Sequence, residues 1–336
     1  MATPTALYAT QLRHELMVRN RIYARGRAHV ESYGGAPVIV YSPENGRHGN
    51  FFDPAYTAIV ARPTWERRLR KAHAQARRAL PKAERTWCEL DSSTSSDALL
   101  MNIFCTPRVA ESAALRNALG VEGDAAPEFG WKARVPLASG RFDRTEVDMR
   151  FGSLLVEAKL TEGNFQTRAA AIVEGYRDLE VVFDRDLLPR VELPPKRWRQ
   201  AAEFPEEYSQ EDESFIAPEP DFIARAEQPL RFAAADAGGA GYANYQLIRN
   251  VLAAYAVGCS FCVLHDERRP DLREEWFQVM AAVRSAELRV RLKVLTWQEL
   301  AALLPERLQE FLNLKYGIAA PGRMIAPIGD LPNFGD

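Results

Sequence analysis

The sequence lacks the features of a secreted, disulfide-rich or membrane-spanning protein. It has only four cysteines in 336 residues, too few for a disulfide framework in a chain of this length. Its first 20 residues carry charged side chains and no apolar run, so we expect no signal peptide. The longest apolar run, residues 251–264, is shorter than the ~18 residues of a membrane helix, and Gly258 interrupts it. We therefore expect a cytoplasmic protein without a membrane partner.

Signatures of nucleotide and zinc sites are also missing. No GxxxxGK[ST] segment occurs, so we expect no nucleotide cofactor. Cys259 and Cys262 form a CxxC pair, but no second pair follows at zinc-binding spacing, and the five histidines form no HxH or HxxxH arrangement. We interpret both cysteines as small apolar residues of a buried strand and expect no zinc.

The chain has almost no net charge, yet its charges are distributed unevenly. Forty-three Lys and Arg residues against 45 Asp and Glu give a formal net charge of −2, which excludes a generally basic surface. Residues 62–85 nevertheless hold nine Lys or Arg, and residues 203–227 hold nine acids. The basic segment suits a polyanion bound at one place. A solvated helix face beside an acidic loop is the alternative.

The order of apolar patterns predicts an α/β fold. Helical patterns cover residues 65–80, 97–104, 107–119, 169–183, 244–256 and 299–314, and strand patterns cover 129–137, 145–151, 154–161, 259–264 and 288–295. Three consecutive strands followed by helix–strand alternation favour a mixed β-sheet flanked by helices. We divide the chain into an N-terminal helical extension (1–91) with a basic helix at about 62–85, a core (92–320) and a tail (321–336). A Pro- and acid-rich insertion covers about 184–240 of the core.

The segment 145–166, TEVDMRFGSLLVEAKLTEGNFQ, holds the residues that point to chemistry. As a hairpin it has one wholly apolar face and one face that is nearly all ionisable. A two-residue turn at Phe151-Gly152 sets Asp148 opposite Leu155 and one diagonal step from Glu157. Lys159 projects from the same face as Glu157 because strand side chains alternate.

Two carboxylates and a lysine on one sheet face suit a hard divalent cation. Mg²⁺ prefers oxygen ligands and is often held by one or two carboxylates plus substrate phosphates. Such an ion activates water and neutralises charge on a phosphodiester. A solvent-exposed strand with a Glu–Lys pair is the alternative interpretation.

Asp148, followed nine positions later by Glu157-Ala158-Lys159, resembles the PD-(D/E)XK phosphodiesterase superfamily, whose fold is restriction-endonuclease-like. The resemblance covers about residues 92–264, with Val147 where the motif's name has proline. It implies a Mg²⁺-dependent nuclease, with Mn²⁺ as a substitute, in which Asp148 and Glu157 bind the metal and Lys159 is catalytic. The leading hypothesis is a DNA endonuclease of restriction, defence or repair. RNA as substrate, an exonuclease or structure-specific nuclease, and a catalytically idle nucleic-acid-binding protein are the alternatives.

The resemblance extends to further candidate residues. Glu111 is the candidate third acid, catalytic and metal-binding, with Asp97 and Glu128 as rivals; its other interpretation is favourable placement near a helix start. Gln246 is a candidate catalytic residue on a later helix, or else a core polar contact, and Gln166 is a candidate phosphate contact. The candidate nucleic-acid-binding residues of the basic helix are Arg67, Arg68, Arg70, Lys71, Arg77 and Arg78. Cutting both strands favours a homodimer, and a partner protein of a defence system is the other expected assembly.

Overall fold

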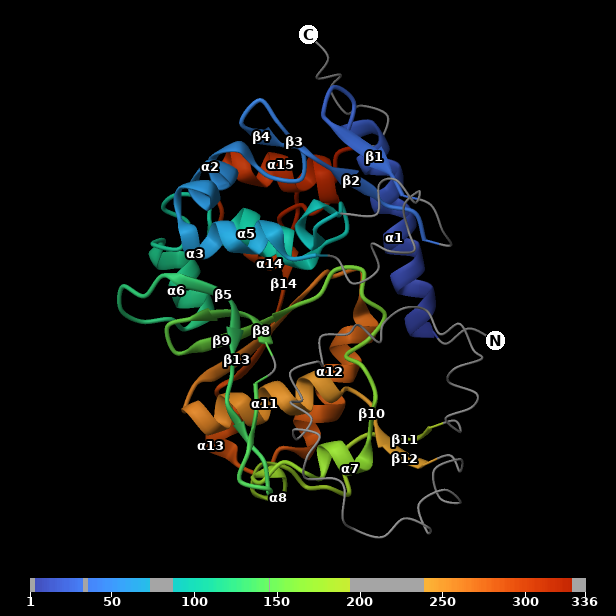
Figure 1. Cartoon of the computed structure of the whole chain (residues 1–336), viewed down its shortest axis with the longest axis vertical. Helices are drawn as coiled ribbons and strands as arrows, with labels where there is room; N and C mark the ends of the chain where they lie inside the picture. The colour runs from blue at the N-terminus through green and yellow to red at the C-terminus, as the bar shows by residue number, and fades with distance from the viewer. Residues whose placement is uncertain (1–3, 33–35, 73–86, 145, 194–238, 328–336) are drawn as a thin grey trace, which may run out of the picture.

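A computed structural model describes residues 4–32, 36–72, 87–144, 146–193 and 239–327 of the chain (Figure 1). Its centre is a five-stranded sheet of order β14-β13-β9-β8-β5. The strands are β5 (Pro127–Lys132), β8 (Glu146–Phe151), β9 (Leu154–Ala158), β13 (Ser260–His265) and β14 (Leu292–Thr296). The first three form an antiparallel meander, and β13 pairs in parallel with both β9 and β14. The predicted mixed sheet is confirmed.

Helices cover both faces of this sheet because its central strands are apolar on both sides. Met149 and Val156 join the core that includes α5 (Ser96–Phe104), α6 (Ala113–Leu119), α14 (Trp297–Ala301) and α15 (Glu306–Tyr316). Leu155 and Phe261 join the core beneath α11 (Tyr245–Val257) and α12 (Pro270–Ala282). Figure 1 shows α5 and α15 on one side of the sheet and α11 and α12 on the other.

The N-terminal segment packs onto the first of these cores. Helix α1 (Pro4–Tyr23) contacts α15, and its Leu16 lies in the same apolar cluster as Met149. Two small antiparallel pairs follow, β1 (His29–Glu31) with β2 (Ile39–Tyr41) and β3 (Pro43–Glu44) with β4 (Arg47–His48), and then α2 (Asp53–Ala61). In the part of the chain that the structure describes, no helix has the length and apolar character needed to cross a membrane.

Of the helix predicted at 65–80, residues 65–70 are helical, and the described part of the chain then departs from the prediction. Helix α3 (Pro63–Glu66) passes into a 3-10 turn, η1 (Arg67–Arg70), and the chain is then extended. Ala72 pairs with Cys88, and the carbonyl of Lys71 accepts a hydrogen bond from the amide of Glu89, just before η3 (Glu89–Asp91). These tertiary backbone contacts replace the helical ones, which a helical residue pattern does not reveal. The second half, 73–86, lies outside the described residues.

The helix predicted at 107–119 begins later, at Ala113, because the Ser112 side chain caps it by accepting from the Leu115 amide. The helix predicted at 169–183 is two short ones, α7 (Ala170–Val173) and α8 (Leu179–Val182). Between them, backbone groups at 175 and 177 hydrogen-bond to residues 138 and 136. A small sheet of β10 (Arg168–Ala169), β12 (Gly239–Tyr242) and β11 (Arg190–Leu193) lies beside these helices.

The C-terminal third contains a crossover that the sequence pattern did not predict. Helix α12 and the short α13 (Ala286–Arg289) connect β13 to β14, so the strand predicted from 288 begins only at Leu292. Parallel neighbours require such a connection, usually a helix. The predicted closing helix is broken into α14 and α15, where Pro305 precedes α15.

Candidate active site

Strands β8 and β9 pair through Met149–Val156, Arg150–Leu155 and Phe151–Leu154. The turn is therefore Gly152-Ser153, with Gly152 at φ +60°, and the predicted turn at Phe151-Gly152 is wrong. The pairing is displaced by two positions, which leaves the faces of the paired side chains unchanged because strand side chains alternate with period two. Val147, beyond the paired residues, departs from the prediction and packs in the α11 core with Leu155 instead of with Met149. Continued by one position, the observed register sets Asp148 opposite Glu157 instead of Leu155.

Strands β8 and β9 separate beyond the Met149–Val156 pair, and the Asp148 side chain bridges the gap between them. Its Oδ2 accepts a hydrogen bond of 2.6 Å from the Ala158 amide. Its other oxygen, Oδ1, has no hydrogen-bond partner within the described residues, so it remains available to a ligand. The separation of the strands thus places one carboxylate between them.

The neighbouring carboxylate, Glu157, is almost fully buried, with 2% of its surface exposed. Its Oε1 lies 3.0 Å from Lys159 Nζ, and its Oε2 accepts a 2.7 Å hydrogen bond from Asn250 Nδ2 on α11. The Lys159 backbone is fixed on both sides, through its amide to Leu264 and its carbonyl to Trp297. The structure therefore brings Asp148, Glu157 and Lys159 together.

Burial and the neighbouring carboxylates shift the pKa values of this cluster. Burial raises the pKa of Asp148 well above its ordinary range, and the carboxylates of Glu157 and Asp97 raise it further. Burial alone would lower the pKa of Lys159, but Glu157 and Glu162 raise it overall. A bound cation would offset the charge that these carboxylates share.

Asp97 approaches the cluster from the first turn of α5, whose N-cap is Ser95. Its Oδ2 lies 2.5 Å from one nitrogen of Arg68, and a second nitrogen of Arg68 lies 2.6 Å from Glu146 Oε1. Burial alone would lower the pKa of Arg68, but Asp97 and Glu146 raise it overall. An ion-pair network thus links the N-terminal extension to the edge of the site.

The other two acids considered from the sequence lie apart from this cluster. Glu111 is exposed and precedes α6, and Glu128 is exposed on β5 opposite Arg150. Within the described ranges neither forms an ion pair or hydrogen bond with Asp148 or Glu157. Among the three acids, only Asp97 affects the pKa of Asp148.

The two candidate glutamines meet where α11 begins, Gln246 in its first turn and Gln166 in contact with its first residue. Gln246 is 8% exposed, and its Oε1 is buried without a hydrogen-bond partner in the described structure. It precedes Asn250 by four residues, so the two share one helix face. The Gln166 backbone has φ +61°, and its carbonyl accepts from the Tyr245 amide where the helix begins.

The basic residues predicted to contact phosphate have different environments. Arg68 and Lys71 take part in ion pairs, Lys71 with Glu89 at 2.9 Å and with Glu146 at 3.2 Å. Arg67 and Arg70 are exposed, with Arg70 paired to Glu66. Arg77, Arg78 and the acidic segment 203–227 lie outside the described residues.

Sequence reasoning missed two residues of α11, Arg249 and Asn250. Arg249 is 5% exposed, and it donates to Asn250 Oδ1 at 3.1 Å and to the carbonyl of Glu146 at 3.2 Å. The helix YQLIRNVLAAYAV is otherwise mostly apolar. Polar residues three and four positions after Gln246 were a readable signal for a functional helix face.

The donor set fits a hard divalent cation. All candidate ligands are carboxylate oxygens, which Mg²⁺ prefers, and the pKa of Asp148 is raised by burial first and then by the neighbouring carboxylates. In the described ranges no group of three or more His, Cys, Asp or Glu is arranged to hold a metal by itself. A partial carboxylate set suits Mg²⁺, because this ion keeps several waters and also binds substrate phosphates.

A family model described as restriction endonuclease associating with ARP matches residues 17–317 of the chain. No curated protein and no solved structure matches. The matched range includes Asp97, Asp148, Glu157 and Lys159, together with the sheet that carries them. The fold is therefore restriction-endonuclease-like, and the resemblance seen in the sequence is confirmed. The chain belongs to the family of restriction endonucleases described as associating with ARP, and so to the nucleases.

Proposed function

We propose that this chain is a Mg²⁺-dependent endonuclease that hydrolyses phosphodiester bonds of DNA. The observation that carries the proposal is the convergence of Asp148, Glu157 and Lys159 where β8 and β9 separate. Membership in a family of restriction endonucleases supports the reaction class. A role in defence against foreign DNA follows the same family description.

Asp148 and Glu157 would hold the metal, with Mn²⁺ as a substitute. As the third acid we prefer Asp97 to Glu111, because the charge of Asp97 reaches Asp148 whereas Glu111 is exposed and apart from the cluster; in the described residues the three carboxylates are not already arranged as a metal site. When bound, Mg²⁺ supplies positive charge against the phosphodiester and lowers the pKa of water.

The chain's own residues would position this chemistry. The Lys159 ammonium, held by Glu157, offers a fixed positive charge to the negative charge that develops on the phosphate during attack. Asn250 fixes the orientation of Glu157 through its hydrogen bond. The unpartnered Oε1 of Gln246 provides a polar group for substrate or water.

One such site cuts one strand, so cleavage of both strands would require a second copy or a second event. The family description also names an association with ARP. We extend that association to this chain and propose that a partner protein accompanies the nuclease.

The test is cleavage of supercoiled and linear plasmid in Mg²⁺, in Mn²⁺ and in EDTA. Lys159→Met is expected to reduce the rate at least ~100-fold, because it removes a charge that stabilises the transition state. Lys315→Met, at an equally buried lysine of α15, serves as the control and should retain cleavage. Nicked or linear products would identify an endonuclease, and progressive degradation an exonuclease.

Cleavage that persists in EDTA, or that survives Lys159→Met, would contradict the proposal. Tight, salt-sensitive DNA binding without any cleavage would instead support the idle nucleic-acid-binding alternative.

A further inference from the structure

A β-ribbon extends beyond the central sheet next to the candidate site. Strands β5 and β8 pair through Lys132–Glu146, and β6 (Val135–Pro136) and β7 (Phe142–Asp143) continue in the same register through Val135–Asp143. We call residues 132–144 the basic ribbon. In Figure 1 it descends from β5 and β8, passes α11 and reaches α8.

The inner face of the basic ribbon is firmly attached to the molecule. Ala133 and Val135 are buried in the α11 core, and the Asp143 carboxylate accepts a 2.5 Å hydrogen bond from the Tyr176 hydroxyl. Backbone hydrogen bonds join Arg177 to Pro136 and residue 138 to residue 175. A surface on this ribbon is therefore held in place before any ligand arrives, which lowers the entropic cost of binding.

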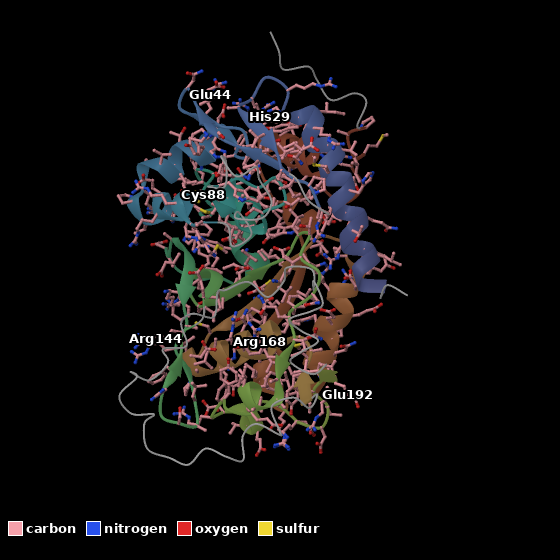
Figure 2. All side chains as sticks on the ribbon, turned by 45° about the vertical axis from the view of Figure 1, so that its right-hand side comes forward. His29, Glu44, Cys88, Arg144, Arg168 and Glu192 are labelled. Atoms are coloured by element: carbon pink, nitrogen blue, oxygen red, sulfur yellow. The ribbon has the colours of Figure 1, made fainter. Side chains whose placement is uncertain are left out.

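The outer surface of the basic ribbon is positively charged. Four exposed cations lie on it, namely Lys132, Arg134, Arg141 and Arg144. Within the described residues none of the four forms an ion pair. The only acid of the segment is Asp143, which is directed to Tyr176 on the inner side. Arg134 stacks over the half-exposed ring of Phe142 at 4.5 Å, and Figure 2 shows Arg144 at the outer edge of the molecule.

The register relates these cations to the catalytic carboxylate. Arg144 precedes Asp148 by four positions, so the ribbon lies next in the chain to the strand that carries the candidate metal ligand. Continued from the Val135–Asp143 pair, the register sets Arg134 beside Arg144. Two exposed guanidinium groups thus lie side by side at the end of the ribbon that adjoins β5 and β8.

We propose that the basic ribbon is the DNA-backbone-binding element of this nuclease, with Arg134 and Arg144 contacting phosphates on one side of the cut. This inference rests on the proposed function and adds the surface that holds the substrate. It assigns phosphate binding to residues other than Arg68 and Lys71, because those two cations are already neutralised by carboxylates. Contacts of this kind give position and affinity without sequence specificity.

The experiment measures binding with cleavage switched off. In a Lys159→Met background, the affinity for a fluorescent DNA duplex is followed by anisotropy between about 50 and 200 mM salt. Arg134→Ala/Arg144→Ala is compared with Arg25→Ala/Arg307→Ala, which removes two exposed arginines elsewhere. Because each lost phosphate contact reduces the slope of log affinity against log salt by ~0.9, the ribbon variant should lose ~2 units of slope. Its affinity should fall at least ~10-fold, and the control should match the parent.

Unchanged affinity and slope in the ribbon variant, with the parent binding DNA normally, would overturn the ribbon assignment and leave the nuclease proposal intact. Failure of the wild-type chain to bind or cut any DNA would overturn both. A second readout is cleavage with Lys159 present, where the ribbon variant should raise KM more than it lowers kcat, since its contacts lie away from the reacting phosphate.

Discussion

Asn250 Nδ2 donates a 2.7 Å hydrogen bond to Glu157 Oε2, across 93 residues of sequence. Both residues are buried, and Lys159 holds the other oxygen of the same carboxylate. The orientation of a candidate metal ligand therefore depends on a helix that covers the sheet face.

Replacing Asn250 by Leu should weaken Mg²⁺ binding ~10–100-fold, because partners that orient a metal ligand contribute on that scale. The measurement is the Mg²⁺ concentration that gives half-maximal cleavage, together with calorimetric titration of Mg²⁺. Asn20→Leu is the control, since Asn20 is an equally buried asparagine that hydrogen-bonds to Leu16 and Lys315, outside the site. Equal Mg²⁺ requirements in the two variants would show that Asn250 is structural only.

Replacing each candidate third acid in turn tests which one contributes to cleavage. Asp97→Asn should lower the cleavage rate at least ~100-fold if this carboxylate helps to hold the metal. Glu111→Gln should stay within about twofold of wild type, because Glu111 is an exposed surface carboxylate. The rates are measured at saturating Mg²⁺ on the same plasmid. A large loss in Glu111→Gln with none in Asp97→Asn would restore the assignment expected from the sequence.

Arg68 should contribute far more to stability than Arg70, although both form short ion pairs with carboxylates. Arg68→Met leaves Asp97 and Glu146 without their shared partner at a site where Arg68 is 11% exposed, so the free energy of unfolding should fall by about 3 kcal/mol. Arg70 is 75% exposed, and Arg70→Met should change the free energy of unfolding by less than about 0.5 kcal/mol. Urea denaturation of both variants provides the measurement. Similar small losses would mean that the network is dispensable for folding.

Lys315 predicts a pH dependence of stability. Burial lowers the pKa of this fully buried ammonium well below its ordinary range, and Arg27 lowers it further. Between that lowered pKa and the unfolded value of about 10.4, the unfolded chain binds the extra proton, so stability rises with pH and is lost as pH falls.

Lys315→Met should therefore be more stable than wild type at neutral pH, and its stability should rise less steeply toward pH 10. The difference in slope is at most about 1.4 kcal/mol per pH unit. Unfolding free energies of both proteins across this pH range test the prediction, with Lys132→Met as an exposed control. Parallel curves for wild type and Lys315→Met would contradict it.

Much of the site could be predicted from local sequence because apolar and ionisable residues alternate at every second position along the two strands. The alternation from Met149 to Leu160 assigns each side chain to a face, and a two-position error in register leaves those faces unchanged, whereas Val147 packs in the α11 core against the prediction. Asp148, Glu157 and Lys159 were therefore found together, although the turn was misplaced. The end of α6 at Gly120 was also predictable, because a glycine after the last turn is a local signal.

Tertiary structure decided the rest, because the remaining contacts join residues that are distant in sequence. The carbonyls of residues 136 and 175 take part in hydrogen bonds between the basic ribbon and the 174–178 turn, which accompanies the break between α7 and α8. The proximity of Asp97 to Asp148 depends on how α5 meets the sheet, and the hydrogen bond from Asn250 to Glu157 depends on how α11 covers it. Sequence alone thus determined which residue types share a strand face, since that follows from backbone geometry. Only packing determined which helices supply their partners, since packing energies arise between segments and leave no periodic trace within either one.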